Sequence, residues 1–299
     1  MGYAEIPWTA EVAEAVEAEW GIRVETAERL TGGEESAAYL VAGACGAAGV
    51  VVGTAGAGAG VGGAEGREGV VVRLGSTARG SALVEWCHRV AGSTGVDEVV
   101  VPLRTSSGAS VVRVGGRPVS VWPFVGGRWL DAGDTAEVEQ AARLLARVHR
   151  GLRDVVMPAR PERSYLEFGG GDGELDRWLA GFGRRKQPLH GDYYRGNLLV
   201  DRGRISGVID WDEAWVGAPE VELAGAAREF GDHWSTDLGR AREFVAWYHD
   251  EGGTAGELDD EMLVQLIRHR LRAEVTAFGG DGTDEYYDRL RELFVKLRP

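Results

Sequence analysis

The spacing of apolar residues predicts short strands in the first part of the chain, around two helices. Residues 10–20 place Val12, Val16 and Trp20 on one helical face, while glutamates cover the other. A second helix is predicted over residues 81–90. Apolar runs of strand length predict a sheet, and they cover residues 23–30, 39–41, 70–74, 99–103, 110–114 and 118–122.

Helical periodicity dominates from residue 134 onward. Asp134 followed by Glu137 is a capping-box-like start, and apolar residues then recur at helical spacing as far as Leu152. One predicted hairpin interrupts this pattern, because residues 198–200 and 205–209 are apolar runs joined by a polar Asp-Arg-Gly-Arg turn. Further helices are predicted over residues 174–185, 220–230, 236–250, 257–278 and 284–297.

Composition and charge restrict the function classes. The chain has 299 residues, of which 44% are hydrophobic, enough for one large domain or two coupled lobes with a sizeable core. Its net charge of −14 argues against nucleic acid or an anionic membrane as the main partner and favours cationic ligands. Two cysteines and six scattered histidines form neither a disulfide framework nor a zinc-ligand spacing. Without a signal-peptide pattern at the N-terminus, the expected location is the reducing cytoplasm.

An uncharged stretch over residues 37–64 superficially resembles a transmembrane helix and a dinucleotide-binding loop. Nine glycines between Gly43 and Gly63 lower its helix stability and hydrophobicity, which argues against a transmembrane helix. Its Gly58-x-Gly60-x-x-Gly63 pattern lacks the following helix that a dinucleotide site requires. We expect a Gly/Ala-rich excursion between two strands, with no role assigned to residues 43–69.

Three polar residues at the ends of the predicted hairpin carry the candidate chemistry. Asp192 and Asn197 lie before the first strand, and Asp210 follows the second. The hairpin is expected to bring these side chains close together. A carboxylate, an amide and a second carboxylate can divide two tasks between them, because one orients a hydroxyl group and the others hold a divalent cation.

The pattern His-Gly-Asp-x4-Asn-x12-Asp-Trp, from His190 to Trp211, closely resembles the aminoglycoside phosphotransferase family, whose relatives include choline, homoserine and thioribose kinases. The resemblance implies an α+β, two-lobed protein-kinase-like fold, with an N-lobe of antiparallel sheet plus helix and a mainly helical C-lobe. It implies a nucleotide-binding lobe over residues 1–122, a hinge over 123–127 and a catalytic and acceptor-binding lobe over 128–299. Asp192 would be the catalytic residue, and Asn197 and Asp210 would bind Mg²⁺.

The same resemblance places the phosphate donor, ATP or GTP, in the first lobe. Val70-Val71-Val72-Arg73-Leu74 takes the position of the strand whose basic residue contacts phosphates, with arginine in place of the lysine of protein kinases. Glu85, on the predicted helix, is the acid expected to pair with Arg73. The other expected nucleotide-binding residues are Gly32, Gly33 and Ser36 of a glycine turn, and Phe124 and Val125 of the hinge.

The acceptor is expected to be a small, cationic, hydroxylated antibiotic such as an aminoglycoside, which implies antibiotic resistance or self-protection. Residues 210–237 contain eight acids and one base, and tryptophans among them can contact a cation. Alternative acceptors are a macrolide, homoserine, a choline-like molecule or a sugar. The acidic segment could instead be a solvated surface, and the protein could instead be a nucleotide-binding pseudokinase scaffold. A monomer or homodimer is expected. The proposed acceptor-binding residues are Trp211, Asp212, Glu213, Trp215 and Glu222.

Overall fold

The structure of the protein is a computed structural model that describes residues 6–31, 36–45, 69–280 and 284–298. The chain divides into two compact units, and each is described by itself. The first unit comprises Met1–Gly92, Asp97–Trp129 and Leu198–Asp212. The second unit comprises Ser93–Val96, Leu130–Asn197 and Glu213–Pro299.

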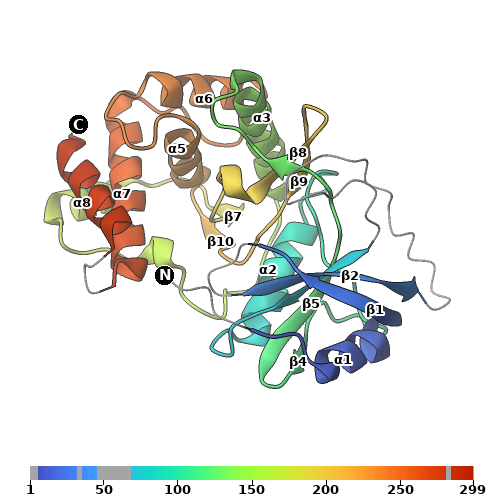
Figure 1. The fold of residues 1–299 in the computed structure, drawn as a ribbon. Helices are drawn as coiled ribbons and strands as arrows, with labels where there is room; N and C mark the ends of the chain where they lie inside the picture. The colour runs from blue at the N-terminus through green and yellow to red at the C-terminus, as the bar shows by residue number, and fades with distance from the viewer. Residues whose placement is uncertain (1–5, 32–35, 46–68, 281–283, 299) are drawn as a thin grey trace. The chain divides into compact units, whose positions relative to one another are not determined.

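A five-stranded antiparallel sheet with the order β1-β2-β3-β5-β4 forms the centre of the first unit (Figure 1). Burial alternates along the third strand, so Val70, Val72 and Leu74 enter the core while Arg73 lies on the opposite face. Gly115 and Gly116 both adopt positive φ in the turn of the last hairpin, as a tight two-residue turn requires. The strands are β1 (Ile22–Arg29), β2 (Ala37–Cys45), β3 (Val70–Leu74), β4 (Val112–Val114) and β5 (Arg117–Pro123).

Helix α1 (Ala10–Trp20) covers one face of this sheet. The Thr9 hydroxyl accepts a hydrogen bond from the Val12 N–H at its start, and Gly21, with φ of 68°, ends it. The apolar face of the helix is buried against the sheet, and each fully buried apolar side chain contributes about 1.5–3 kcal/mol. Helix α2 (Ser81–Gly92) is the second predicted helix of this unit and is also present.

The predicted hairpin belongs to the first unit, although the sequence placed it in the second lobe. Strands β8 (Leu198–Asp201) and β9 (Arg204–Val208) form a three-stranded sheet with β6 (Arg128–Trp129). The predicted strand over residues 99–103 is instead an extended segment with a single bridge, between Val99 and Val208. Pro102 interrupts it, because proline has no N–H to donate to a ladder.

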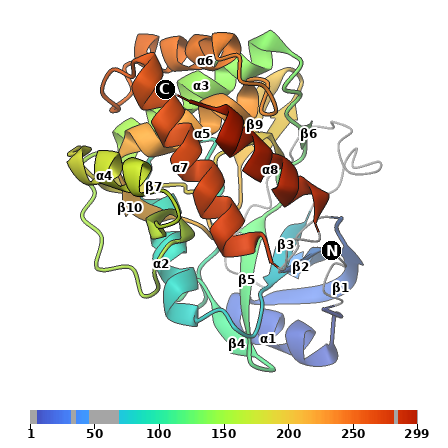
Figure 2. The same ribbon diagram turned by 90° about the vertical axis from the view of Figure 1, so that its left-hand side faces the viewer.

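The second unit is mainly helical, as predicted. Side-chain caps fix several helix starts: Asp134, Asp172, Asp259 and Asp284 each accept a hydrogen bond from a backbone N–H in the first turn. The long helices α7 and α8 lie side by side (Figure 2). The helices are α3 (Thr135–Leu152), α4 (Gly173–Gly181), α5 (Pro219–Phe230), α6 (Gly239–Asp250), α7 (Asp260–Phe278) and α8 (Glu285–Lys296).

Short elements complete the second unit and support its loops. Strand β7 (Gln187–Leu189) pairs with β10 (Trp215–Gly217), and single 3₁₀ turns form at η1 (Tyr165–Glu167) and η2 (Arg195–Asn197). Helix α5 is buried over almost its whole length among its neighbours. Among the described residues, no helix combines the length and the apolar character that crossing a membrane requires.

Candidate active site

The loop after β7 brings two of the predicted site residues together. The Asn197 side-chain amide donates to Asp192 Oδ2 at 3.1 Å and to the Asp192 backbone carbonyl at 2.8 Å. Asn197 is buried, whereas the Asp192 side chain is 34% exposed and so remains accessible to solvent. The predicted proximity of these two residues is therefore observed within the second unit.

Gly191 allows the loop to turn between His190 and Asp192. Its φ is 87°, in the left-handed region that favours glycine. A Cβ at this position would lie 2.0 Å from the Glu213 carbonyl oxygen, so any side chain would displace the neighbouring backbone. The His-Gly-Asp sequence thus has a steric reason for its central glycine.

A buried carboxylate supports this loop from beneath. Glu222 on α5 accepts hydrogen bonds from the backbone N–H groups of His190, at 3.2 Å, and Gly191, at 2.5 Å, and its Oε2 lies 2.8 Å from His149 Nε2. Burial alone would raise the pKa of the Glu222 carboxyl, but the hydrogen bonds and the nearby histidines hold that pKa below its usual value. His149 is fixed in turn, because its Nδ1 lies 2.8 Å from the Tyr248 hydroxyl.

This position differs from the expected role of Glu222. The sequence placed it on an acceptor-binding wall, but the side chain is enclosed and its oxygens serve the backbone of the loop. Trp211 and Trp215 are also buried, so neither presents an exposed ring to a ligand. Glu213 is half-buried and packs its carbonyl against Gly191. Sequence reasoning missed these roles because the contacts join distant segments.

The first unit contains a second constellation, around Arg73. Its guanidinium lies 3.2 Å from Asp210 Oδ1 and donates to both carboxylate oxygens of Asp212, at 3.0 and 3.2 Å. It also donates to the Ser36 hydroxyl at 3.1 Å. Burial opposes the charge on Arg73, but Asp210 and Asp212 raise the pKa of this guanidinium above its usual value.

Asp212 is the most heavily paired acid of this constellation. Arg79 adds a 2.6 Å contact to its Oδ2. Burial alone would raise the pKa of the Asp212 carboxyl, yet Arg73 and Arg79 hold it below its usual value. Asp210 is more open, with 41% of its side chain exposed, and its φ of 60° is unusual for a residue other than glycine.

The partner of Arg73 differs from the one predicted. Glu85 on α2 accepts a hydrogen bond from the Ser110 N–H at 3.1 Å, whereas Arg73 is paired with Asp210 and Asp212. The two acids compensate the charge that Glu85 was expected to balance. The sequence did offer a signal for this pairing, because Asp212 lies two positions after Asp210. The prediction assigned Asp212 to acceptor binding instead.

The remaining predicted nucleotide-binding residues lie in the glycine turn and the hinge. Gly32 and Gly33 lie outside the described residues. Phe124 and Val125 follow β5 and are half-buried. Gly207 of β9 comes close to Val125, since a Cβ on Gly207 would lie 3.2 Å from the valine side chain. Nucleotide binding by Phe124 and Val125 stays a prediction.

The chemistry of Asn197 and Asp210 suits a magnesium ion. Both provide hard oxygen donors, and the Asn197 amide nitrogen points to Asp192, which leaves its oxygen on the other side of the amide. Among the described residues, no group of three or more histidine, cysteine or acidic side chains can hold a metal by itself. Mg²⁺ is commonly held by one or two protein ligands together with phosphates and water, and each of these residues can supply one such ligand.

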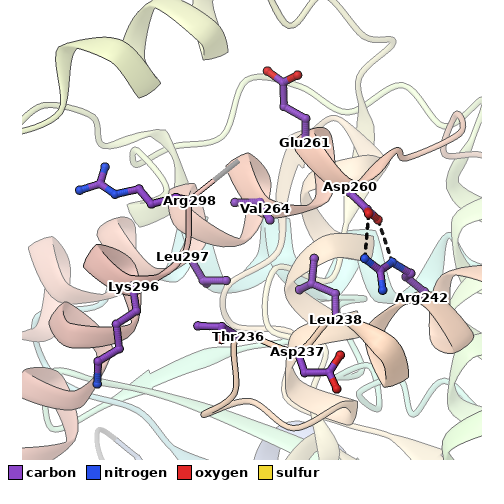
Figure 3. A pocket seen from close by; sticks show the side chains of 10 residues that line it. All are labelled: Thr236, Asp237, Leu238, Arg242, Asp260, Glu261, Val264, Lys296, Leu297 and Arg298. Carbon is purple, nitrogen blue, oxygen red and sulfur yellow. Dashed lines mark hydrogen bonds and ion pairs between the residues drawn. The ribbon is translucent and has the colours of Figure 1, made fainter.

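A surface cavity of about 350 Å³ lies elsewhere in the second unit (Figure 3). Arg242 and Asp260 form a forked ion pair at its edge, with both N···O distances at 2.7 Å. None of the predicted site residues that the structure describes lines this cavity. The lining residues are Thr236, Asp237, Leu238, Arg242, Asp260, Glu261, Val264, Lys296, Leu297 and Arg298.

Sequence comparison supports the resemblance that the motif predicted. Residues 172–258, which contain Asp192, Asn197 and Asp210, match the model of the phosphotransferase enzyme family. A segment of 51 residues is 39% identical to hygromycin-B 4-O-kinase of Escherichia coli. That segment is 17% of this chain and spans only about 15% of the curated relative.

Comparison with solved structures covers nearly the whole chain. Amicoumacin kinase hAmiN, in complex with AMP-PNP, Ca²⁺ and Ami, has a TM-score of 0.68 at 14% identity, over 95% of this chain and 92% of that one. Spectinomycin phosphotransferase, in complex with ADP and spectinomycin, has a TM-score of 0.60 at 15% identity, over 99% and 96%. A thermostable mutant of aminoglycoside phosphotransferase APH(4)-Ia, in a ternary complex with AMP-PNP and hygromycin B, has a TM-score of 0.58 at 18% identity, over 96% of this chain and 98% of that one. The predicted α+β, kinase-like fold is thereby confirmed.

Proposed function

We propose that this protein transfers the γ-phosphate of ATP or GTP to a hydroxyl group of a small molecule, in a reaction that depends on Mg²⁺. The observation that carries the proposal is the loop in which Asp192 is hydrogen-bonded to Asn197 and supported from beneath by Glu222. The kinase-like fold and the match to a phosphotransferase family supply the context. Catalysis of this kind comes mainly from positioning and charge compensation.

Each predicted residue has a defined task in this mechanism. Asp192 orients the acceptor hydroxyl and accepts its proton as the phosphoryl group transfers. Asn197 and Asp210 would hold the magnesium ion, which neutralises charge on the donor phosphates when it is bound. Arg73 can contact phosphate oxygens through its fork of N–H donors. These contacts would replace its present contacts with carboxylates.

The acceptor belongs to the class of small hydroxylated molecules, and antibiotics are the leading candidates. Names of similar proteins include hygromycin B, spectinomycin and kanamycin as their ligands or substrates. The charge argument for a cationic acceptor is weaker than the sequence indicated. Asp212 and Glu229 are each paired with an arginine inside the protein, and Glu222 is enclosed, so fewer negative charges are available to attract an ammonium group.

A turnover assay tests the proposal. The protein is incubated with MgATP or MgGTP and a panel of hygromycin B, kanamycin, spectinomycin, a macrolide, homoserine, choline and simple sugars, and products are analysed by mass spectrometry. We expect one acceptor class to gain a single phosphoryl group, with Asp192→Asn as the inactive control. Nucleotide binding without turnover on any acceptor would instead favour the pseudokinase scaffold.

A further inference from the structure

An arginine that the sequence did not single out contacts the loop of the proposed catalytic residue. Arg270 on α7 places Nη2 2.9 Å from Asp192 Oδ1, and its Nη1 donates to the Gly191 carbonyl at 2.7 Å. One planar guanidinium therefore binds the carboxylate and the backbone carbonyl of consecutive residues. Such forked, charge-assisted contacts are shorter and more directional than neutral hydrogen bonds.

Arg270 is itself held in place from two sides. Its Nε donates to Glu274 Oε1, one turn further along α7, at 2.5 Å. The Tyr165 ring lies 5.2 Å from its guanidinium carbon, and the Tyr165 hydroxyl donates to the same Gly191 carbonyl at 3.3 Å. Only 11% of the Arg270 side chain is exposed. Because these contacts restrict the rotamer, the fork is oriented before any substrate binds.

The two oxygens of the Asp192 carboxylate have different partners. Arg270 contacts Oδ1 and Asn197 donates to Oδ2, so the plane of the carboxylate is fixed from both ends. An ionised carboxylate offers about four lone-pair positions, so these bonds are compatible with a further bond from an acceptor hydroxyl. The arrangement suits a group whose task is to orient a hydroxyl for in-line transfer.

We propose that Arg270 is a positioning residue for phosphoryl transfer, which fixes the orientation of Asp192 and the path of the loop at Gly191. This inference rests on the proposed function, because it assigns Arg270 a role through Asp192. Lysine cannot fully replace it, since an ammonium group has no planar fork for two acceptors. A purely structural ion pair would instead affect the stability of the fold and leave the rate per folded molecule unchanged.

The helix supplies a matched control for this test. Arg272, two positions further on α7, is also buried and lies 2.6 Å from Asp176 Oδ1, and within the described part of the chain its polar contacts are to Gly170 and Asp176, away from the loop of Asp192. Arg270→Lys and Arg272→Lys therefore make the same chemical change in the same helix. Both variants keep the positive charge, so both are expected to fold.

The experiment measures kcat and KM for MgATP with the panel antibiotic that wild type phosphorylates fastest. We expect Arg270→Lys to lower kcat on the order of 10–100-fold, with KM for MgATP changed by less than about twofold, because misplacement of a reacting group by an ångström can cost that much. Arg270→Ala should lose more activity, and added guanidinium should restore part of it. Arg272→Lys should keep kcat near wild type. Equal losses in the two lysine variants would overturn the inference.

Hydrogen exchange gives a readout that does not depend on knowing the acceptor. Peptides that cover residues 190–197 should exchange faster in Arg270→Lys than in Arg272→Lys or wild type. Unchanged exchange in this segment would overturn the positioning role, whatever the activity. Asp192→Asn separates the two proposals: if that variant retains wild-type turnover, the proposed function fails, whereas an inactive Asp192→Asn beside a fully active Arg270→Lys removes only Arg270.

Discussion

Two arginines bind the candidate carboxylates in different ways. Arg270 binds one candidate site carboxylate, that of Asp192, and is anchored by the Glu274 carboxylate and the Tyr165 ring. Arg73 instead meets two carboxylates, of which Asp210 is 41% exposed. The Arg270 guanidinium is thus contacted by two further side chains beside Asp192, whereas the Asp210 contact of Arg73 is partly open to solvent. If Asp192 orients a hydroxyl group and Asp210 binds a cation, as proposed, the two tasks use different degrees of constraint.

The largest effect is expected at Asp192, whose carboxylate contacts Arg270 and Asn197. Asp192→Asn keeps the size of the side chain but removes the proton acceptor, so turnover should fall by roughly 10²–10⁴-fold. Binding of Mg-AMP-PNP, measured by calorimetry, should survive because no proposed nucleotide ligand is lost. Near-wild-type turnover would exclude Asp192 from the mechanism.

A smaller effect, on nucleotide binding and turnover together, is expected at Asp210. Asp210→Ala should weaken Mg-nucleotide binding and lower turnover together, by about 10²-fold in rate, because a hard cation loses an anionic oxygen ligand. Asp212→Ala is the control, since it also breaks contacts of Arg73 but removes no proposed metal ligand. Calorimetry that shows equal Mg-nucleotide affinity in Asp210→Ala and wild type would contradict the metal assignment.

Glu222, which accepts hydrogen bonds from the loop before Asp192, is expected to affect the stability of the fold in a way that depends on pH. Glu222→Gln should lower the free energy of unfolding at neutral pH by about 1–3 kcal/mol, because a neutral amide replaces the buried carboxylate that accepts hydrogen bonds from two backbone N–H groups and contacts His149. The pKa of Glu222 is depressed in the folded state, so its contribution is present above the unfolded-state pKa and is lost as pH falls through the folded one. The difference between wild type and variant should therefore shrink below pH 4.5, the usual value.

Urea denaturation at several pH values measures this difference. Glu220→Gln is the matched control, because Glu220 is a buried neighbour on α5 that accepts a hydrogen bond from the Gly256 N–H and is not part of the loop. A pH-independent difference between Glu222→Gln and wild type would show that the charge of Glu222 is not what stabilises the fold.

The smallest effect concerns the charge of the acceptor. If the acceptor is cationic, raising the salt concentration should increase its KM severalfold, since exposed attractions are screened over about 8–10 Å. Neutralising Asp212 and Glu213 together should add little, because Asp212 is already compensated by Arg73 and Arg79. A KM that does not respond to salt would exclude a cationic acceptor without affecting the kinase assignment.

Much of the fold was predictable because local patterns determine it. The predicted helix over residues 10–20 and the strand over 70–74 have the observed bounds, since the first follows the helical period and the second is a short run rich in valine. Helix α6 begins at Gly239, later than predicted, because the Asp237 carboxylate accepts a hydrogen bond from the Gly239 N–H in a preceding turn. Boundaries of this kind depend on side-chain contacts that periodicity does not encode.

The candidate site was predictable in its residue types more than in its partnerships. The spacing of Asp192 and Asn197 is short, and their contact within one loop followed from it. The partner of Arg73 is 139 positions away, at Asp212, and that of Asp192 is 78 positions away, at Arg270. No local pattern encodes such pairs. They depend on how strands and helices pack, and therefore only a three-dimensional structure identifies them.

The tight turn at Gly191 limits how this loop can be redesigned. Protein kinases carry arginine at the middle of the corresponding His-Arg-Asp sequence. Here a single methyl group would already meet the Glu213 carbonyl oxygen at 2.0 Å. Installing a protein-kinase-type arginine, as a handle for a phosphorylation switch, would therefore require rebuilding the backbone around residue 213 as well as changing residue 191.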